Sequence, residues 1–142
     1  LAKAIPALTE RVHSHREFAA LSLDSLLGPL AAKGRTLSVD TLDSMVFLNR
    51  GGRFEAVALP AMAQESPAFG VSVADLDGDG HEDLFLAQNF FGVDAETSRH
   101  DAGLGLLLTG DGRGHFKALS PAASGIVLTG EGRGSAARST WL

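Results

Sequence analysis

The first part of the chain has the hydrophobic spacing of a helical segment. Between Ile5 and Leu30, apolar residues recur at intervals that suit one face of a helix. They are Leu8, Val12, Phe18, Leu21, Leu23, Leu26 and Leu27. Ser14 followed by Glu17 predicts a capping box at a helix start, and Gly28-Pro29 predicts the end of the segment. We therefore expect an N-terminal helical segment.

From Met45 onward the pattern changes to short apolar runs separated by turns, which is typical of β-strands. Met45–Asn49 and Phe54–Leu59 flank an Arg-Gly-Gly-Arg turn and predict one hairpin. Leu104–Thr109 and His115–Leu119 flank a Gly-Asp-Gly-Arg-Gly turn and predict another. The chain is therefore expected to be mainly β beyond its helical start.

The two predicted hairpins are weakly similar to each other. Leu-Asn-Arg-Gly-Gly-Arg-Phe, ending at Phe54, echoes Leu-Thr-Gly-Asp-Gly-Arg-Gly-His-Phe, ending at Phe116. A repeat of about 60 residues built from short strands suggests the four-stranded blades of a β-propeller.

A nine-residue acidic run between two apolar stretches carries the most distinctive chemistry of the chain. Asp75-Leu-Asp-Gly-Asp-Gly-His-Glu-Asp83 places carboxylates at loop positions 1, 3, 5 and 9, with glycines at 4 and 6. Alternating acids in a tight loop point toward one centre, and the glycines let the backbone bend there. Calcium takes about six to eight oxygen ligands. We therefore predict a calcium site formed by the side chains of Asp75, Asp77, Asp79 and Asp83 and the backbone carbonyl of His81.

The alternative interpretation is a solvated acidic turn that holds no metal. Four acids this close repel one another unless a cation or solvent screens them, which favours metal binding. The loop is not an EF-hand, because position 12 is Leu86 and not a bidentate glutamate. Its flanks, Phe69–Ala74 and Leu84–Ala87, are the apolar, partly β-branched runs of buried strands. A calcium loop inside a β-hairpin predicts a structural clamp, in which the ion stabilises the hairpin, and not a calcium sensor.

Composition and charge exclude a few classes of protein and of site. The chain has 142 residues, of which 44% are hydrophobic and 20% charged, enough for one domain with a core. A net charge of -5, with scattered Lys and Arg, argues against a nucleic-acid-binding surface. The absence of cysteine excludes disulfides and thiolate metal sites. No apolar run reaches the roughly 18 residues of a membrane span, and no signal segment is present in this chain.

No pattern in the chain predicts a catalytic site. The glycine clusters that begin at Gly110 and Gly130 could suggest a phosphate-binding loop, but a P-loop needs Gly-Lys-Ser/Thr and a following helix. The residues after Gly114 are strand-like, so the first cluster is interpreted as a hairpin turn. No nucleophile elbow, zinc-protease motif or cysteine nucleophile appears. We therefore expect a protein that is not an enzyme.

Taken together, these motifs resemble an FG-GAP/VCBS repeat, a unit that forms blades of integrin-like β-propellers with calcium in the hairpin loop. The resemblance is closer to the ASPIC/UnbV family, relatives of cartilage acidic protein, where a similar helical insertion precedes a blade. It rests on an ordered set of motifs: Phe47-Leu-Asn-Arg-Gly-Gly-Arg-Phe54, Leu59-Pro with Ala63-Gln64, Ser66-Pro-Ala-Phe-Gly70, the acidic loop, Gln88-Asn-Phe-Phe-Gly92 and Asp101-Ala-Gly-Leu-Gly-Leu-Leu-Leu108. The resemblance covers nearly the whole chain and implies the same five calcium ligands.

The resemblance also implies a fragment of an integrin-like β-propeller, with about one full four-stranded blade and parts of its neighbours. The expected divisions are a helical segment, the hairpin of a preceding blade, the calcium-loop blade and the truncated start of the next blade: residues 1–30, 45–60, 69–120 and 121–142. The blade spacing predicts a second calcium loop near residue 139, where the chain instead reads Arg138-Ser-Thr-Trp-Leu142. The outer strands are therefore expected to contact blades that this chain lacks.

Two classes of function remain open from the sequence. The leading one is a calcium-stabilised, non-enzymatic module that binds or adheres to an unidentified protein or carbohydrate. It is expected to be extracellular, at the cell surface or periplasmic, because weak calcium sites suit the high calcium outside cells. The alternative is an accessory propeller part of a secreted carbohydrate-active enzyme. The chain has no Tyr and a single Trp, Trp141, so few of the aromatic side chains that stack on sugars are available. The binding module is therefore favoured.

Overall fold

The computed structural model describes residues 6–137, and the chain divides into two compact units, residues 1–40 and residues 41–142. Trp141 and the position expected for a second acidic loop, near residue 139, lie outside the described residues. Among the described residues, no helix is both long enough and apolar enough to cross a membrane.

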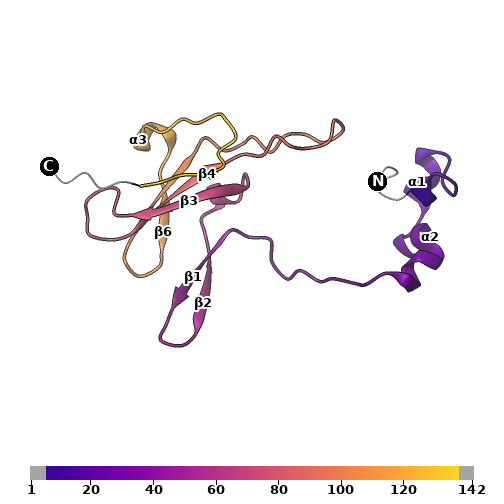
Figure 1. The fold of residues 1–142 in the computed structure, drawn as a ribbon, viewed down its shortest axis with the longest axis horizontal. Helices are drawn as coiled ribbons and strands as arrows, with labels where there is room; N and C mark the ends of the chain where they lie inside the picture. The colour runs from indigo at the N-terminus through magenta and orange to yellow at the C-terminus, as the bar shows by residue number, and fades with distance from the viewer. Residues whose placement is uncertain (1–5, 138–142) are drawn as a thin grey trace. The chain divides into compact units, whose positions relative to one another are not determined.

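The first unit consists of several short helices. They are η1 (Pro6–Leu8), α1 (His15–Ala20), α2 (Leu23–Leu27) and η2 (Gly28–Lys33) (Figure 1). The predicted cap at Ser14 is confirmed, because its Oγ accepts a hydrogen bond from the Glu17 amide at 3.2 Å. The Glu17 carboxylate accepts from the amide of His13 at 2.8 Å. Leu21 and Ser22 are extended, with ψ of 140° and 161°, and this extended pair separates α1 from α2.

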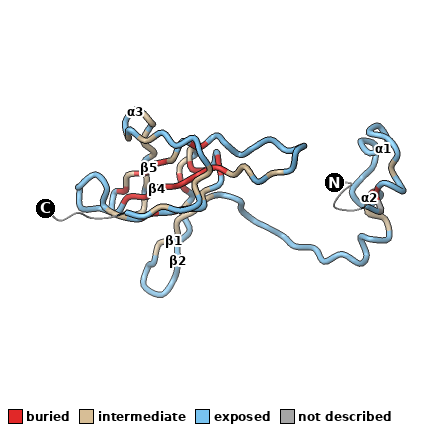
Figure 2. Tube along the Cα trace, turned by 45° about the horizontal axis from the view of Figure 1, so that its top comes forward, coloured by how far each residue is buried: buried red, intermediate tan, exposed pale blue. Residues whose placement is uncertain are grey.

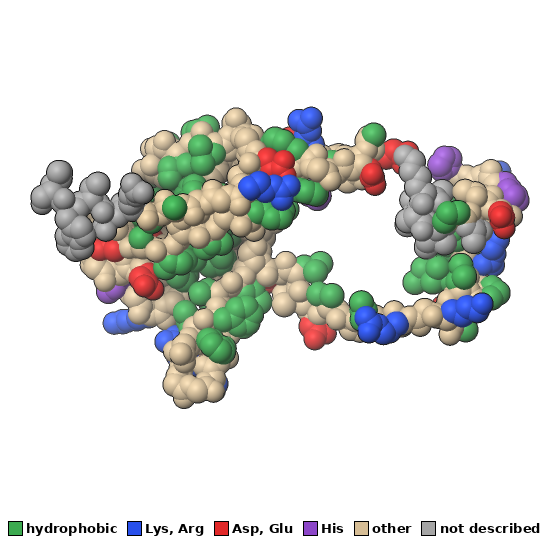
Figure 3. All heavy atoms as spheres, in the orientation of Figure 1, with side chains coloured by type: hydrophobic (Ala, Val, Ile, Leu, Met, Phe, Trp, Pro, Cys, Tyr) green, Lys and Arg blue, Asp and Glu red, His purple; other side chains and the backbone are tan. Residues whose placement is uncertain are grey.

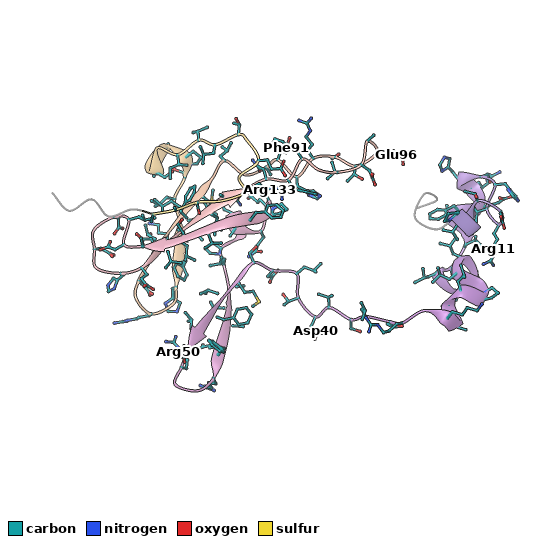
Figure 4. All side chains as sticks on the ribbon, viewed as in Figure 1. Arg11, Asp40, Arg50, Phe91, Glu96 and Arg133 are labelled. Atoms are coloured by element: carbon teal, nitrogen blue, oxygen red, sulfur yellow. The ribbon has the colours of Figure 1, made fainter. Side chains whose placement is uncertain are left out.

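The helical segment was predicted to end at Gly28-Pro29, but a short 3-10 helix, η2, continues it to Lys33. Pro29 lies in the first turn of η2, where its fixed φ and missing amide hydrogen are tolerated. The carbonyl groups at the end of α2 are satisfied by Arg11, whose guanidinium donates to the carbonyl oxygens of Ser25 and Leu26, both at 3.1 Å (Figure 4). Gly28 therefore caps the end of α2, and Pro29 is accommodated near the start of the short helix that follows.

The second unit is mainly β and contains two antiparallel sheets (Figure 1). The smaller sheet pairs β1 (Met45–Asn49) with β2 (Phe54–Ala58), and the larger has the order β3 (Ala68–Ala74), β4 (Asp83–Gln88), β5 (Leu106–Gly110) and β6 (Phe116–Ala118). Two short helices, η3 (Ala61–Ala63) and α3 (Pro121–Ser124), lie between and after the strands. Each strand of the larger sheet pairs with the next strand in the sequence, as in a propeller blade. The predicted fold class, mainly β and consistent with part of a β-propeller, is confirmed.

The turn between β1 and β2 depends on its two glycines. Gly51 and Gly52 have φ of 66° and 102°, and a Cβ on either would meet no atom within 4 Å. The left-handed backbone, and not lack of space, therefore favours glycine at both positions. The amide of Arg50 donates to the carbonyl of Arg53 at 2.9 Å and closes the hairpin.

The core lies on one face of the larger sheet, beneath the connection from β2 to β3. Residues two apart on a strand face the same side, which brings alternate leucines of β4 and β5 together. The buried cluster consists of Leu59, Ala63, Leu84, Leu86, Leu106 and Leu108. Figure 2 shows the buried positions concentrated on β4 and β5. These two strands are central in the sheet, so their side chains are shielded by neighbours on both sides.

The opposite face of the larger sheet is crossed by residues 125–137. The amide of Gly132 donates to the carbonyl of Gln88 at 2.8 Å, and the Ser72 hydroxyl donates to the Ser135 hydroxyl oxygen at the same distance. The cover leaves an open groove of about 620 Å³ whose lining includes Phe85 and Leu107. The described part of the segment expected to begin the next blade therefore forms α3 and an extended stretch that packs on this sheet.

Asn89 fixes the chain where it leaves β4. It is buried and has a φ of 85°, a conformation that asparagine tolerates better than most residues. Its Nδ2 donates to the carbonyls of Gly103 and Gly130, at 2.8 and 3.1 Å. Its Oδ1 accepts from the Ser66 hydroxyl at 3.0 Å and from the Gly103 amide at 2.9 Å. One side chain thus ties three separate segments of the second unit to the end of β4.

Several large apolar side chains of the second unit remain exposed. Phe47 and Phe54 lie on the β1–β2 hairpin, and Val71 and Val73 lie on β3, an edge strand of the larger sheet. Figure 3 shows apolar side chains at the surface over the hairpin. β3 carries no charged residue and no proline, the features that usually protect a sheet edge from pairing with another chain. This edge is therefore a candidate site for self-association.

We predict that truncating the core destabilises the second unit strongly. Leu108 is fully buried, so Leu108→Ala should leave a cavity and lower the free energy of unfolding by about 2–5 kcal/mol in a urea titration. The matched control is Leu42→Ala, because Leu42 is 90% exposed and should change stability little. Equal unfolding midpoints for the two variants would contradict the assignment of the core.

We also predict that the protein self-associates through the β3 edge. Light scattering after size-exclusion chromatography should give a mass above the 14.8 kDa of the monomer, rising with protein concentration. Val71→Lys should return the mass toward that of the monomer, because a charge on the edge strand opposes pairing. Val127→Lys is the control, since Val127 is equally exposed but lies outside the strands. A monodisperse monomer at all concentrations would refute the prediction.

Candidate metal centre

The acidic loop joins two strands that pair directly. β3 ends at Ala74 and β4 begins at Asp83, and these two residues are partners in the register. Within the loop, Gly78 and Gly80 have φ of 83° and 87°. These left-handed turns fold the loop back on itself, so the sheet fixes both ends while the glycines bend the middle.

The structure brings three of the predicted ligands together. One carboxylate oxygen from each of Asp75, Asp77 and Asp83 lies within 4.8 Å of the other two. Oxygens that bind one calcium ion at about 2.4 Å are at most about 5 Å apart. The three carboxylates therefore fit around a single hard cation. Asp83 is buried, whereas Asp75 and Asp77 are exposed to solvent.

Asp79 and His81 do not belong to this group. The Asp79 Oδ1 accepts a hydrogen bond from the amide of His81 at 2.8 Å. The His81 side chain turns to the next hairpin, where its ring lies against the backbone of Gly112. The Asp79 carboxylate and the His81 carbonyl stay predicted ligands, because one hydrogen bond to Oδ1 leaves lone pairs on the Asp79 carboxylate and the contacts of His81 concern its amide and its ring.

Asp83 connects the loop to the sheet through both of its carboxylate oxygens. Its Oδ2 accepts from the amides of Leu76 and Asp77, at 2.8 and 3.2 Å. Its Oδ1 accepts from the amide of Gly110, on β5, at 2.9 Å. Since a carboxylate offers about four lone-pair positions, these three bonds leave room for a metal ion. Asp83 therefore holds the loop in place and can also act as a ligand.

Asp75 shapes the loop from its other end. Its Oδ1 accepts from the amides of Gly78 and Asp79, at 2.7 and 3.1 Å, and its Oδ2 accepts from the amide of Gly80 at 3.0 Å. The Asp77 Oδ1 accepts from the amide of Asp79, also at 3.1 Å. The loop backbone thus wraps around these two carboxylates, which orients them before they contact an ion.

The three clustered carboxylates carry negative charge without a basic partner among the residues that the structure describes. The ion pairs seen there join other residues, namely Arg50 with Glu55, His115 with Asp111 and Arg133 with Glu131. Carboxylates this close to one another are mutually repulsive. A divalent cation would remove that repulsion, and an all-oxygen donor set suits calcium or magnesium better than softer metals.

Sequence reasoning missed Gly110 as a part of this centre. The Gly-Asp-Gly-Arg-Gly cluster was interpreted only as a hairpin turn, yet its first glycine donates to a predicted ligand, Asp83. Nothing in the sequence distinguishes Gly110 from the turn glycines that follow it. Gly110 belongs to β5 and does not adopt a left-handed conformation.

Comparison with known proteins bears on this region. Residues 36–86 match the family model of an FG-GAP-like repeat. The matched stretch contains the β1–β2 hairpin, β3, the whole acidic loop and the first part of β4. No curated protein and no solved structure matches the chain. The loop and its flanking strands are therefore similar to an FG-GAP-like repeat, in agreement with the sequence prediction of that repeat.

The turn between β5 and β6, which contains Asp111, lies next to the acidic loop. The Asp111 Oδ1 accepts from the amides of Arg113 and His115, at 2.8 and 3.1 Å. Its Oδ2 lies 2.7 Å from the His115 Nδ1. The hydrogen bond from the His115 side chain and that from the Arg113 amide lower the pKa of the Asp111 carboxyl well below its usual 3.8. The turn is thus held by one ionised carboxylate.

We predict that the pKa of Asp111 depends on His115. Because the folded-state pKa is lowered, the stabilisation by Asp111 is present above pH 3.8 and is lost as the pH falls below this value. Its contribution should be small, since Asp111 is exposed. In a carboxyl carbon NMR titration, His115→Ala should raise the pKa of Asp111 toward the usual value. His13→Ala, in the first unit, is the control. An unchanged titration in His115→Ala would contradict the assigned cause.

Proposed function

We propose that this protein is a calcium-stabilised binding module of the β-propeller type and not an enzyme. The observation that carries the proposal is the group of three carboxylates, Asp75, Asp77 and Asp83, within a loop that joins two paired strands of an FG-GAP-like repeat. Asp79 and the carbonyl of His81 complete the proposed ligand set. The similarity of the motifs to ASPIC/UnbV proteins supports the same proposal.

Calcium is favoured over magnesium by the character of the donors. Magnesium keeps several waters and usually takes one or two carboxylates, whereas calcium accepts a larger and less regular set of oxygens. This loop offers three carboxylates in one group and a fourth, from Asp79, two residues after Asp77. When bound, calcium supplies positive charge that neutralises these acids. The residues themselves shape the loop, through the bonds to Asp75 and Asp83.

The proposed role of the ion is to stabilise the fold and not to switch it. Both ends of the loop are held by the pairing of Ala74 with Asp83, and the strands on either side continue that pairing. A loop with fixed ends cannot open its flanking strands without breaking the sheet. We therefore propose a static clamp, which suits an extracellular, cell-surface or periplasmic protein in calcium-rich surroundings. Its partner would be a protein or a carbohydrate.

We predict that calcium binds this loop and raises the melting temperature of the protein. Calorimetric titration with CaCl2 should show one site, and MgCl2 should bind more weakly. The melting temperature should rise with the logarithm of free calcium above the dissociation constant, with little change in circular dichroism. The double variant Asp75→Ala, Asp77→Ala should abolish binding, since it removes two of the three clustered carboxylates.

The matched control is the double variant Asp94→Ala, Asp101→Ala, which removes the same charge from two exposed aspartates outside the loop. It should bind calcium as the unaltered chain does. Unchanged binding in the loop variant would refute the site. A large gain of secondary structure on adding calcium to folded protein would refute the clamp.

A further inference from the structure

We infer that the metal site extends beyond the acidic loop to Gly110 on β5, which acts as a positioning residue for the ligand Asp83. This inference rests on the proposed calcium site. Gly110 lies 27 positions after Asp83 in the sequence but next to it in the sheet. It contributes no ligand atom. Two independent features of Gly110 fix the place of the Asp83 carboxylate.

The first feature is its backbone amide. The Gly110 amide donates to the Asp83 Oδ1 at 2.9 Å, and this bond is buried. The other oxygen of the same carboxylate accepts from the amides of Leu76 and Asp77, inside the loop. The carboxylate is therefore held between the loop and the neighbouring strand pair. Hydrogen bonds of this kind orient metal ligands and raise their effective affinity.

The second feature is the missing side chain. A Cβ built on Gly110 would overlap the backbone carbonyl oxygen of Glu82. Since that oxygen is backbone, it cannot rotate away as the end of a flexible side chain could. Gly110 is not in the left-handed region, so close approach is the reason for glycine here. Any other residue would push away the peptide bond that joins Glu82 to Asp83.

The same turn supports the loop at a second point. The ring of His81 lies against Gly112, where a Cβ would clash with the imidazole. Gly112 has a φ of 68°, so it also needs glycine for its backbone conformation. The loop end therefore rests on two glycines of one turn, and of these only Gly110 donates a hydrogen bond to a carboxylate of the clustered acids. This difference makes Gly110 the position to test.

The experiment compares Gly110→Ala with Gly130→Ala in the full chain. Gly130 is the matched control, because its Cβ would meet nothing within 4 Å and its φ is not left-handed. Calorimetric titration with CaCl2 should show a loss of affinity of about 10–100-fold for Gly110→Ala, the usual effect of removing an outer partner of a ligand. Gly130→Ala should stay within about twofold of the unaltered chain.

A spectroscopic measurement separates positioning from general destabilisation. Terbium replaces calcium at oxygen sites, and its luminescence lifetimes in H2O and D2O give the number of bound water molecules. If Asp83 leaves the ion, about one water should take its place in Gly110→Ala. A variant that only lowered stability would keep the hydration of the ion unchanged. Unchanged affinity and hydration in Gly110→Ala would overturn the inference and leave the calcium site intact.

Failure of the proposed function gives a different result. If the unaltered chain binds neither calcium nor terbium, the calcium site and this inference both fall.

If Gly110→Ala does not fold, the unaltered chain still provides a test. On addition of CaCl2, the Gly110 amide resonance should shift with the same concentration dependence as the loop amides. Gly132, whose amide donates to Gln88 at the other end of β4, is the control. A Gly110 resonance that stays fixed while the loop amides shift would overturn the inference.

Discussion

The buried carboxylate of Asp83 is the constraint on which the arrangement of the acidic loop depends. It stands at the first position of β4 and is fully buried, yet it carries a charge in the ionised form. A buried carboxylate is strongly unfavourable unless hydrogen bonds and an opposite charge compensate for it. Backbone amides from both sides supply the hydrogen bonds. No ion pair among the described residues includes Asp83, so the proposed calcium ion would supply the opposite charge.

The two exposed acids of the centre differ from the buried Asp83 in their contact with water. Asp75 and Asp77 lie at the surface, where water solvates their charges at little cost to the fold. The bends at Gly78 and Gly80 bring them to the buried carboxylate, and hydrogen bonds from the loop amides keep them there. One buried anchor and two solvent-exposed carboxylates give a site that a cation can enter directly from solution.

The sequence was sufficient wherever a local rule determined the structure. Short apolar, partly β-branched runs predicted β3 and β4, and the Gly51-Gly52 pair predicted the hairpin turn before them. The helical segment was only partly predictable, because the hydrophobic pattern continues through Leu21 and Ser22, where the backbone is extended. Of the four acids expected to converge, Asp75, Asp77 and Asp83 lie together, and Asp79 stays a predicted ligand outside this group. Which acids group together depends on the loop backbone, which spacing alone does not reveal.

Gly110 shows a limit of a different kind. Its importance depends on the pairing of β4 with β5, which brings residues from distant parts of the sequence into contact. A glycine needed for close approach has no signature of its own, unlike a glycine needed for a turn. The glycine cluster around it was correctly interpreted as a hairpin turn, and that interpretation hid the separate role of its first member. Contacts between neighbouring strands therefore carry the information about the metal centre that the nine-residue loop does not.

The two ends of β4 differ in the charge of the side chain that fixes them. Each end is fixed by a buried polar side chain, Asp83 at the start and Asn89 just after the last residue. The Asn89 amide is neutral, and both its oxygen and its nitrogen have two hydrogen-bond partners from the protein. Asp83 accepts three hydrogen bonds from backbone amides, but hydrogen bonds from neutral amides do not cancel the charge of a carboxylate. The asparagine end is satisfied by hydrogen bonds within the protein, whereas at the aspartate end a cation would compensate the charge of the clustered carboxylates.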